Sequence, residues 1–205
     1  VSLLAVCWWY FEDVDERSRH QAQLHTVSLI DAETGLLNFR GLLLVGEDYM
    51  EAYRRYGTDY VCVVLEVPEY EQVFRDYGDE VAGKLLQAIT DQLLKIYSLK
   101  GTLARLSGCR FFYITRQRLN RDFRSTLLDL TNAIHGITAI GGYSCTLYLQ
   151  YAVVQGSEGR DFDEIMQLLR ERLKDAEEQR YGQAVYIGDR LVFDKEKFDK
   201  LDEEV

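Results

Sequence analysis

Proline and long apolar runs are scarce in this chain of 205 residues. A single proline and 15 glycines exclude a collagen-like or proline-rich chain, and 47% hydrophobic residues suffice for a packed core. The apolar start at residues 1–11 is shorter than the roughly 20 residues of a membrane-spanning helix, and no basic leader marks a signal peptide. This start suits either a strand or the tail of a membrane helix that begins upstream. The length favours one compact α/β domain with an extension.

Positive charge is also scarce. The chain has 24 lysines and arginines against 34 aspartates and glutamates, so the formal net charge is -10 and the pI is about 4.9. No run of five or more basic residues occurs. Nucleic acids and anionic membranes need a basic surface, so this balance excludes both as main partners.

Cysteine and histidine are few and are not spaced as metal ligands. The cysteines are Cys7, Cys62, Cys109 and Cys145, and the histidines are His20, His25 and His135. No C-x-x-C pair is present, and His20 and His25 would point to different faces of a helix. We therefore predict structural thiols in a reducing compartment and no zinc site.

A β-hairpin is predicted at residues 102–115. Two apolar runs there flank a four-residue interruption, Ser107 to Arg110. The β-branched and aromatic residues of both runs favour strands, and Gly108 can adopt the positive φ that a tight turn needs.

The other predicted elements alternate between helices and strands. Residues 59–67 are nearly continuous in β-branched and apolar side chains, which predicts a central strand covered on both faces. Asn38 is placed to cap the helix that follows it. The remaining expectations are helices at 39–56, 119–134 and 162–180, paired strands within 138–155 that turn at Gly141-Gly142, and a closing strand within 184–193.

Two stretches resemble the GGDEF family, the diguanylate cyclases. Residues 104–111, ARLSGCRF, follow the frame of the family pattern A-R-L-G-G-D/E-E-F. Residues 31–40, DAETGLLNFR, follow the pattern D-x-L-T-G-L-x-N-R-R at Asp31, Thr34, Gly35, Leu36, Asn38 and Arg40. The resemblance implies an α/β (α+β) fold like the class III nucleotide cyclase core. Its parts are a central, mostly antiparallel five-stranded sheet, flanking helices and an N-terminal linker helix.

The resemblance also divides the chain. The sequence FEDVDER, at residues 11–17, is similar to the end of a PAS-type sensor domain that runs into a signalling helix, although Asp13 or Asp15 also suits a plain helix N-cap. The expected organisation is the end of a PAS-like domain or a linker strand at 1–14, a coupling helix at 15–30, a degenerate GGDEF domain at 31–195, and a tail or a linker to a further domain at 196–205.

The signature turn lacks the carboxylates with which the family binds magnesium. Pro68 and Glu71 also stand in place of the family's second aspartate and its lysine, which leaves Glu66 as the only remaining candidate ligand. Diguanylate synthesis needs magnesium ions with oxygen ligands, whereas Cys109 is a soft ligand and Arg110 adds a positive charge. We therefore expect no productive magnesium binding and no other cofactor. The residues of the degenerate turn are Ser107, Gly108, Cys109, Arg110 and Phe111.

The residues at the family's nucleotide-reading positions also differ. Phe74 and Gly83 stand where the family has the asparagine and aspartate that read guanine. Such residues cannot replace the lost polar pairs of a site that reads a base by hydrogen bonds. Gln179 and Gln183 stand where it has phosphate-binding cations, and residues 98–101 lack the R-x-x-D of the inhibitory product site. The expectation is a pseudoenzyme.

Two alternatives remain open at the hairpin. Asn38, Arg105 and Arg110 could contact a nucleotide or phosphate without a metal, since guanidinium groups and turn amides suit phosphate. Against this, Arg110 could be a solvated turn residue and Arg105 a member of a structural ion pair. Cys109 could be a reactive thiol, because the charge of Arg110 would lower its pKa.

The expected function is that of a catalytically inactive GGDEF-like module for regulation, dimerisation or signal relay in bacterial cyclic di-GMP-type signalling. The alternatives are an allosteric module that binds GTP without turnover and an active enzyme, including one with altered chemistry. Expected partners are a second copy, another domain of the same protein such as a phosphodiesterase module, or a nucleotide, and not nucleic acid. The resemblance implies a cytoplasmic location, either free or as the cytoplasmic part of a membrane-anchored sensor.

Overall fold

The computed structural model describes residues 28–97, 100–116, 121–178, 186–187 and 190–191. The helices and strands predicted downstream of residue 38 are confirmed, with ends shifted by a few residues. In chain order the elements are α3 (Phe39–Tyr56), β1 (Val61–Glu66), α4 (Glu69–Tyr97), β2 (Thr102–Ser107), β3 (Arg110–Thr115), α5 (Arg121–His135), β4 (Ala139–Ile140), β5 (Tyr143–Ser144), β6 (Gln150–Gln155), the 3-10 helix η1 (Gly156–Glu158), α6 (Phe162–Glu178), β7 (Tyr186–Ile187) and β8 (Arg190–Leu191).

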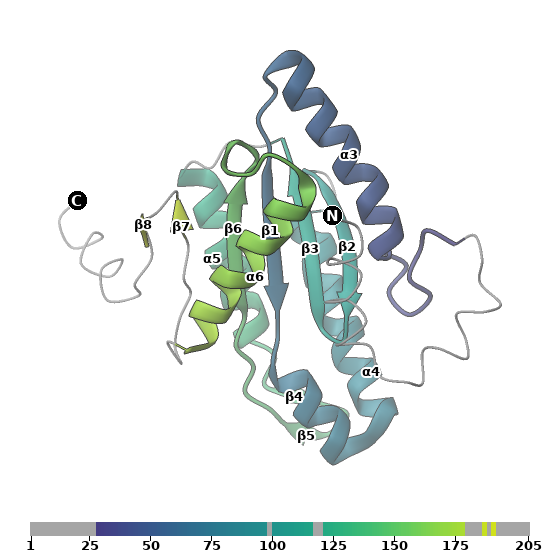
Figure 1. Cartoon of the computed structure of the whole chain (residues 1–205). Helices are drawn as coiled ribbons and strands as arrows, with labels where there is room; N and C mark the ends of the chain where they lie inside the picture. The colour runs from purple at the N-terminus through teal and green to yellow at the C-terminus, as the bar shows by residue number, and fades with distance from the viewer. Residues whose placement is uncertain (1–27, 98–99, 117–120, 179–185, 188–189, 192–205) are drawn as a thin grey trace.

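A four-stranded antiparallel sheet in the order β2-β3-β1-β6 forms the centre of the structure (Figure 1). β1 pairs with β3 on one side and with β6 on the other, so it is the central strand that its apolar sequence predicts. Glu66, at the end of β1, lies directly opposite Arg110 of β3 and Gln150 of β6. The hairpin of β2 and β3 therefore turns at the end of the sheet where β1 ends.

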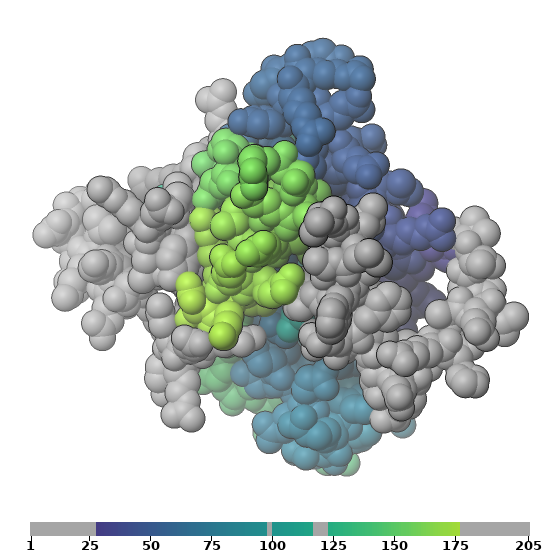
Figure 2. All heavy atoms as spheres, viewed as in Figure 1, coloured from purple at the N-terminus to yellow at the C-terminus, as the bar shows by residue number. Residues whose placement is uncertain are grey.

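Helices cover both faces of the sheet. Side chains alternate along β1, so that Val61, Val63 and Leu65 pack with α4 and α5 in one core, and Cys62 and Val64 pack with α3 and α6 in the other. All five side chains are at most 1% exposed. Figure 2 shows α3 and α6 on the face toward the viewer, with α4 below them. The two cores fix the position of β1, and with it the position of the hairpin turn.

α3 begins after its predicted cap, Asn38, and ends at the predicted residue, Tyr56. The side chain of Asn38 accepts a hydrogen bond from the amide of Gly41 at 3.0 Å, as an N-cap does. Gly57 follows the helix with a φ of 65°, the left-handed conformation that is common after helix C-termini. The predicted helix over 39–56 is therefore confirmed at both ends.

α4 is bent at Gly78, whose φ of 80° lies outside the helical region. A residue without a Cβ tolerates this conformation, so the chain changes direction between two helical segments. Phe74 lies before the bend and Gly83 after it, so the two positions compared with guanine-reading residues belong to different segments.

Two expectations about the ends of the domain are wrong. In the part of the chain that the structure describes, the sheet has four strands and not five, because β7 and β8 pair with each other as a separate two-stranded sheet. Residues 28–30, the end of the expected coupling helix, are not helical. Ile30 forms an antiparallel bridge with Leu37, and the Leu29 carbonyl accepts a hydrogen bond from the Asn38 amide. Because these backbone groups pair with downstream residues, they do not continue a helix.

The expected PAS-like end at 1–14, most of the coupling helix at 15–30 and the tail at 196–205 lie outside the described residues. None of the helices in the described part of the chain combines the length and the apolar character needed to cross a membrane. The domain boundaries and the cytoplasmic location stay predictions.

Replacing Gly156 by alanine is expected to lower the free energy of unfolding by about 1–2 kcal/mol. A Cβ at this position would overlap three ring atoms of Tyr60, a side chain that is 1% exposed. The Gly156 amide also donates to the Tyr60 carbonyl at 2.8 Å, which holds the two residues together. Urea unfolding measures the change.

Gly83→Ala is the matched control for this substitution. No atom lies within 4 Å of the Cβ that it would add, and the position is exposed within a helix. Alanine there is expected to stabilise the protein slightly, because glycine is the weaker helix former. Equal stability of Gly156→Ala and the wild type would contradict close packing of the Tyr60 ring against Gly156.

Candidate functional site

The signature turn, the end of β1 and the start of α4 meet at one end of the sheet. The amide of Val67 donates to the carbonyl of Cys109 at 3.2 Å, which fixes the residues after β1 against the turn. Gly108 has the positive φ that the sequence predicts, at 49°. The structure therefore brings the turn and the candidate ligand Glu66 into one small region.

Glu66 and Arg110 form an ion pair across β1 and β3. The Nη2 of Arg110 lies 2.8 Å from the Oε1 of Glu66, and the side chains of Arg110 and Glu66 are 16% and 17% exposed. The alternative of a solvated Arg110 is wrong, because the two residues are direct cross-strand partners and the guanidinium reaches the carboxylate along the sheet. A cation of the chain itself therefore neutralises the carboxylate that was the candidate metal ligand.

Arg105 is 8% exposed and is paired with residues that precede α3. Its Nη1 lies 3.1 Å from the Oδ1 of Asp31 and also bonds the carboxylate of Glu33, and its Nε donates to the Gly108 carbonyl at 3.0 Å. The expected structural ion pair is confirmed. These donors of Arg105 are directed at the protein and not at a ligand.

The same contact joins the two stretches that carry the family resemblance. Leu37 forms a parallel bridge with Ala104, and the Arg105 amide donates to the Leu37 carbonyl at 2.8 Å. The amide and the hydroxyl of Thr34 both donate to the Oδ1 of Asp31, at 2.9 and 2.7 Å. Burial raises the pKa of Asp31, but the bonds from Thr34 and the charge of Arg105 outweigh it, so the pKa lies below its ordinary value. Asp31 is therefore ionised at neutral pH.

Asn38 has a structural role. Its Oδ1 caps α3, and its Nδ2 donates to the Ser28 carbonyl at 2.9 Å. Of the three residues predicted as nucleotide contacts, the structure brings Arg105 and Arg110 to the turn, and both are paired with carboxylates there. The side chain of Asn38 instead bonds backbone groups on either side of the start of α3.

Cys109 is buried beneath the turn, with 5% of its surface exposed. Burial raises the pKa of its thiol well above the ordinary range, although the charge of Arg105 opposes the rise. The expectation that Arg110 would activate this thiol is wrong, because burial and the nearby carboxylate of Glu66 act in the opposite direction. A neutral buried thiol is a poor nucleophile and a poor metal ligand.

The residues at this end of the sheet do not fit magnesium, the metal that the family resemblance implies. Magnesium prefers several oxygen ligands in octahedral geometry. Glu66 is paired with Arg110, and Cys109 offers a protonated sulfur. Within the described ranges, no three His, Cys, Asp or Glu side chains are grouped as a metal site. We therefore assign no metal-dependent step to these residues.

Two carboxylates at the turn were not predicted from the sequence. Glu33, where the family has leucine, bonds Arg105. The Oε1 of Glu71 would lie 3.0 Å from a Cβ on Gly108, so this carboxylate sits against the turn. A phosphate that approached the turn amides would meet the negative charge of Glu71. The departure of both residues from the family pattern was the only sequence signal for these contacts.

The positions compared with guanine-reading residues offer no polar side chain. Phe74 is half-buried and packs against the core that α4 shares with the sheet. Gly83 is exposed, with no atom within 4 Å of where a Cβ would stand. Neither side chain can donate or accept a hydrogen bond with a base. Gln179 and Gln183, and residues 98–99 of the inhibitory-site comparison, lie outside the described residues.

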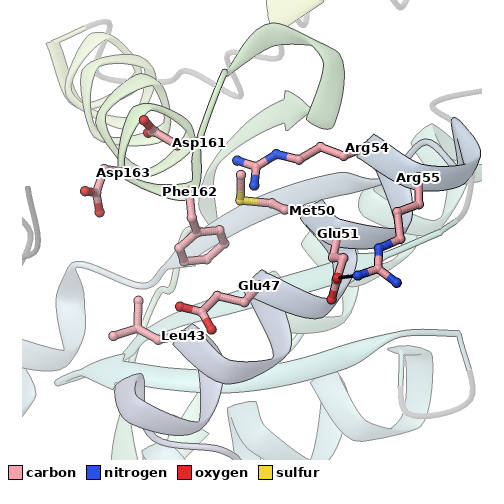
Figure 3. Close-up of a pocket in the computed structure, with 9 residues that line it drawn as sticks. All are labelled: Leu43, Glu47, Met50, Glu51, Arg54, Arg55, Asp161, Phe162 and Asp163. Atoms are coloured by element: carbon pink, nitrogen blue, oxygen red, sulfur yellow. Dashed lines mark ion pairs between the residues drawn. The ribbon is translucent and has the colours of Figure 1, made fainter.

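A separate hollow of about 570 Å³ lies between α3 and the start of α6 (Figure 3). The hollow lies at the end of the sheet opposite to the signature turn, because α6 follows the end of β6 that pairs with Val61. Arg55 pairs with Glu51, and Arg54 donates to the Arg160 carbonyl at 3.3 Å. With more carboxylates than arginines in its lining, the hollow does not suit a phosphate ligand. The lining residues are Leu43, Glu47, Met50, Glu51, Arg54, Arg55, Asp161, Phe162 and Asp163.

Comparisons with known proteins agree on one family. The family model described as "Diguanylate cyclase, GGDEF domain" matches residues 28–183. Among solved structures, the chain is similar to the diguanylate cyclase SiaD from Pseudomonas aeruginosa, solved in complex with its activator SiaC. The identity is 20% and the TM-score 0.69, over 91% of this chain and 70% of that chain.

Two further structures show the same likeness. The coiled coil and GGDEF domain of DgcB from Caulobacter crescentus, in complex with c-di-GMP, is 14% identical with a TM-score of 0.71, over 92% of this chain and 100% of that chain. The FimX GGDEF domain from Pseudomonas aeruginosa is 17% identical with a TM-score of 0.69, over 78% of this chain and 98% of that chain. A comparison with curated proteins finds no significant match.

The likeness to these structures confirms the predicted fold class, an antiparallel sheet flanked by helices as in the cyclase core. The family model covers both stretches that carry the resemblance in the sequence, at 31–40 and at 104–111. Because that model matches most of the chain, the chain belongs to the GGDEF family.

Proposed function

We propose that this domain is a degenerate, catalytically inactive member of the GGDEF family that acts as a regulatory, dimerisation or signal-relay module in cyclic di-GMP-type signalling. The ion pair between Glu66 and Arg110 is the observation that carries the proposal. It places an internal cation on the carboxylate that a magnesium-dependent site would use, and removal of a paired charge from such a position is costly. The turn from Ser107 to Phe111 supplies no other carboxylate.

Further features of the site support inactivity independently. The Cys109 thiol is buried and neutral, Glu71 places negative charge against the turn, and Phe74 and Gly83 offer nothing to read a base. A neighbouring group can compensate for the replacement of a single site residue. The combination removes metal binding, phosphate binding and base reading together.

The support for signal relay is the link between the start of the domain and the turn. Asp31 lies at the start of the domain and forms an ion pair with Arg105. Arg105 in turn donates a hydrogen bond to the Gly108 carbonyl in the turn. A displacement of the chain before Asp31 would therefore act on the turn through a buried ion pair. Relatives have been solved with an activator protein and with a coiled coil, and we include partners of these two kinds in the proposal for this chain.

Thermal unfolding of the full chain with millimolar GTP, ATP or cyclic di-GMP, each with and without magnesium, tests the proposal. A ligand at about 100 times its Kd stabilises by roughly 2.7 kcal/mol, which is readily seen as a shift in Tm. We expect no shift with any of the three. A magnesium-independent shift that is lost in Arg110→Ala would instead favour the allosteric nucleotide-binding module. A magnesium-dependent shift with GTP would contradict the inactive site.

A further inference from the structure

The chain from residue 136 to residue 157 contains no charged side chain, although 28% of the whole sequence is charged. Near the end of this run lies β6, whose four central residues are buried. The first half forms the β4–β5 hairpin and the loop after it, and most of its residues are exposed. Tyr143 and Tyr148 are 47% and 52% exposed. An exposed, uncharged surface with tyrosines has the composition found at the centre of protein interfaces.

Tyr77 of α4 extends this surface. Its ring lies on the ring of Tyr143, with centroids 4.4 Å apart, and the residue is 43% exposed. A Cβ on Gly141 would lie 3.4 Å from Val81, so the hairpin is close to α4 just after the bend. Figure 1 shows β4 and β5 beside α4 at the lower end of the view. We call Tyr77, Tyr143 and Tyr148 the tyrosine surface.

Carboxylates predominate in the part of α4 that carries Tyr77, although Glu80 pairs with Lys84. Between residues 69 and 80 the sequence has five carboxylates and a single basic residue, Arg75. The carboxylate of Glu69 accepts a hydrogen bond from the Tyr148 amide at 3.2 Å. Asp76 and Asp79 are exposed and stand on either side of Tyr77 and the bend. Exposed aromatic rings and exposed carboxylates therefore occur on the same part of α4 and the loop beside it.

We propose that the tyrosine surface binds a basic segment of a partner protein, with arginine or lysine side chains laid on the rings. A cation is attracted by the face of a tyrosine ring, and the carboxylates of Glu69, Asp76 and Asp79 attract the same charge. Bases also stack on tyrosine, but the same carboxylates repel the phosphates of a nucleic acid, which disfavours it as the partner. A second copy of this chain is disfavoured because the formal net charge is -10. The inference does not depend on the inactivity of the signature turn.

A titration of the full chain with a fluorescently labelled octaarginine peptide, read by anisotropy at low salt, tests the proposal. We expect saturable binding that weakens about five- to tenfold when Tyr77 and Tyr143 are both replaced by serine. Replacement of both by phenylalanine keeps the rings and is expected to bind as the wild type does. Tyr56→Ser is the matched control, since Tyr56 is 76% exposed but lies at the end of α3.

A second pair of variants keeps the test valid if the serine variant is less stable. Asp76→Asn with Asp79→Asn is expected to weaken octaarginine binding about two- to fivefold, whereas Glu47→Gln with Asp48→Asn, which removes the same charge from the exposed side of α3, has a smaller effect. Equal effects of the two charge variants, or equal binding by the serine variant and the wild type, would mean attraction by net charge alone and overturn the proposal. Tyrosine-dependent binding of an octathymidylate, or no saturable octaarginine binding, would overturn it as well.

Discussion

Arg105→Met is expected to lower the free energy of unfolding by about 2–4 kcal/mol. The guanidinium is buried, and its removal leaves Asp31 and Glu33 without their cation and the Gly108 carbonyl without its donor. Methionine fills a similar volume, so the loss reports charge and hydrogen bonds more than a cavity. Urea unfolding followed by circular dichroism measures it.

Arg160→Met is the matched control. The side chain of Arg160, just before α6, is 88% exposed and pairs with Glu164 in the first turn of that helix, and such surface pairs contribute little to stability. We expect the urea midpoint to stay unchanged. Hydrogen exchange gives a second measurement for Arg105→Met: amides at residues 31–37 and at the signature turn lose protection together. Loss at the turn alone would mean that Arg105 does not link the two stretches.

Glu66→Gln and Arg110→Met are each expected to cost about 1–3 kcal/mol, and the double variant is expected to cost less than the sum. Each single replacement removes one charge of this ion pair, whose two side chains are about one sixth exposed. A double-mutant cycle should therefore give a coupling energy of about 1–2 kcal/mol.

Additive losses would contradict the ion pair that supports the proposed inactivity. The cycle for Glu80 and Lys84 is the control, because this pair is one helical turn apart and exposed on α4. We expect the losses of that pair to add without measurable coupling, since solvent screens the charges.

The elements could be predicted where local chemistry determines them. Runs of β-branched, aromatic and other apolar side chains define the strands on either side of Gly108, and Asn38 marks the start of α3. Each of these signals acts within a few residues. The candidate site was found in the same way, because the family patterns are short and continuous in sequence.

The partners within the site could not be predicted, because they are distant in sequence. Arg105 and Asp31 are 74 residues apart, and Arg110 and Glu66 are 44 apart. Their pairing depends on the register of β1 against β3 and on the path of the chain before α3. The sequence position of Cys109 next to Arg110 was misleading, because the side chains of neighbouring residues in extended chain point to opposite faces of the sheet. Arg110 reaches Glu66 along the sheet, while Cys109 enters the core.

Catalytic inactivity is tested most directly by pyrophosphate release from GTP, with magnesium or manganese, at high concentrations of the full chain. An active diguanylate cyclase under the same conditions is the positive control, and Glu66→Gln of this chain controls for contaminating activity. We predict release no faster than in buffer, identical for the wild type and Glu66→Gln. Pyrophosphate release with formation of cyclic di-GMP, abolished in Glu66→Gln, would show that Glu66 still serves a metal and that the domain is an enzyme.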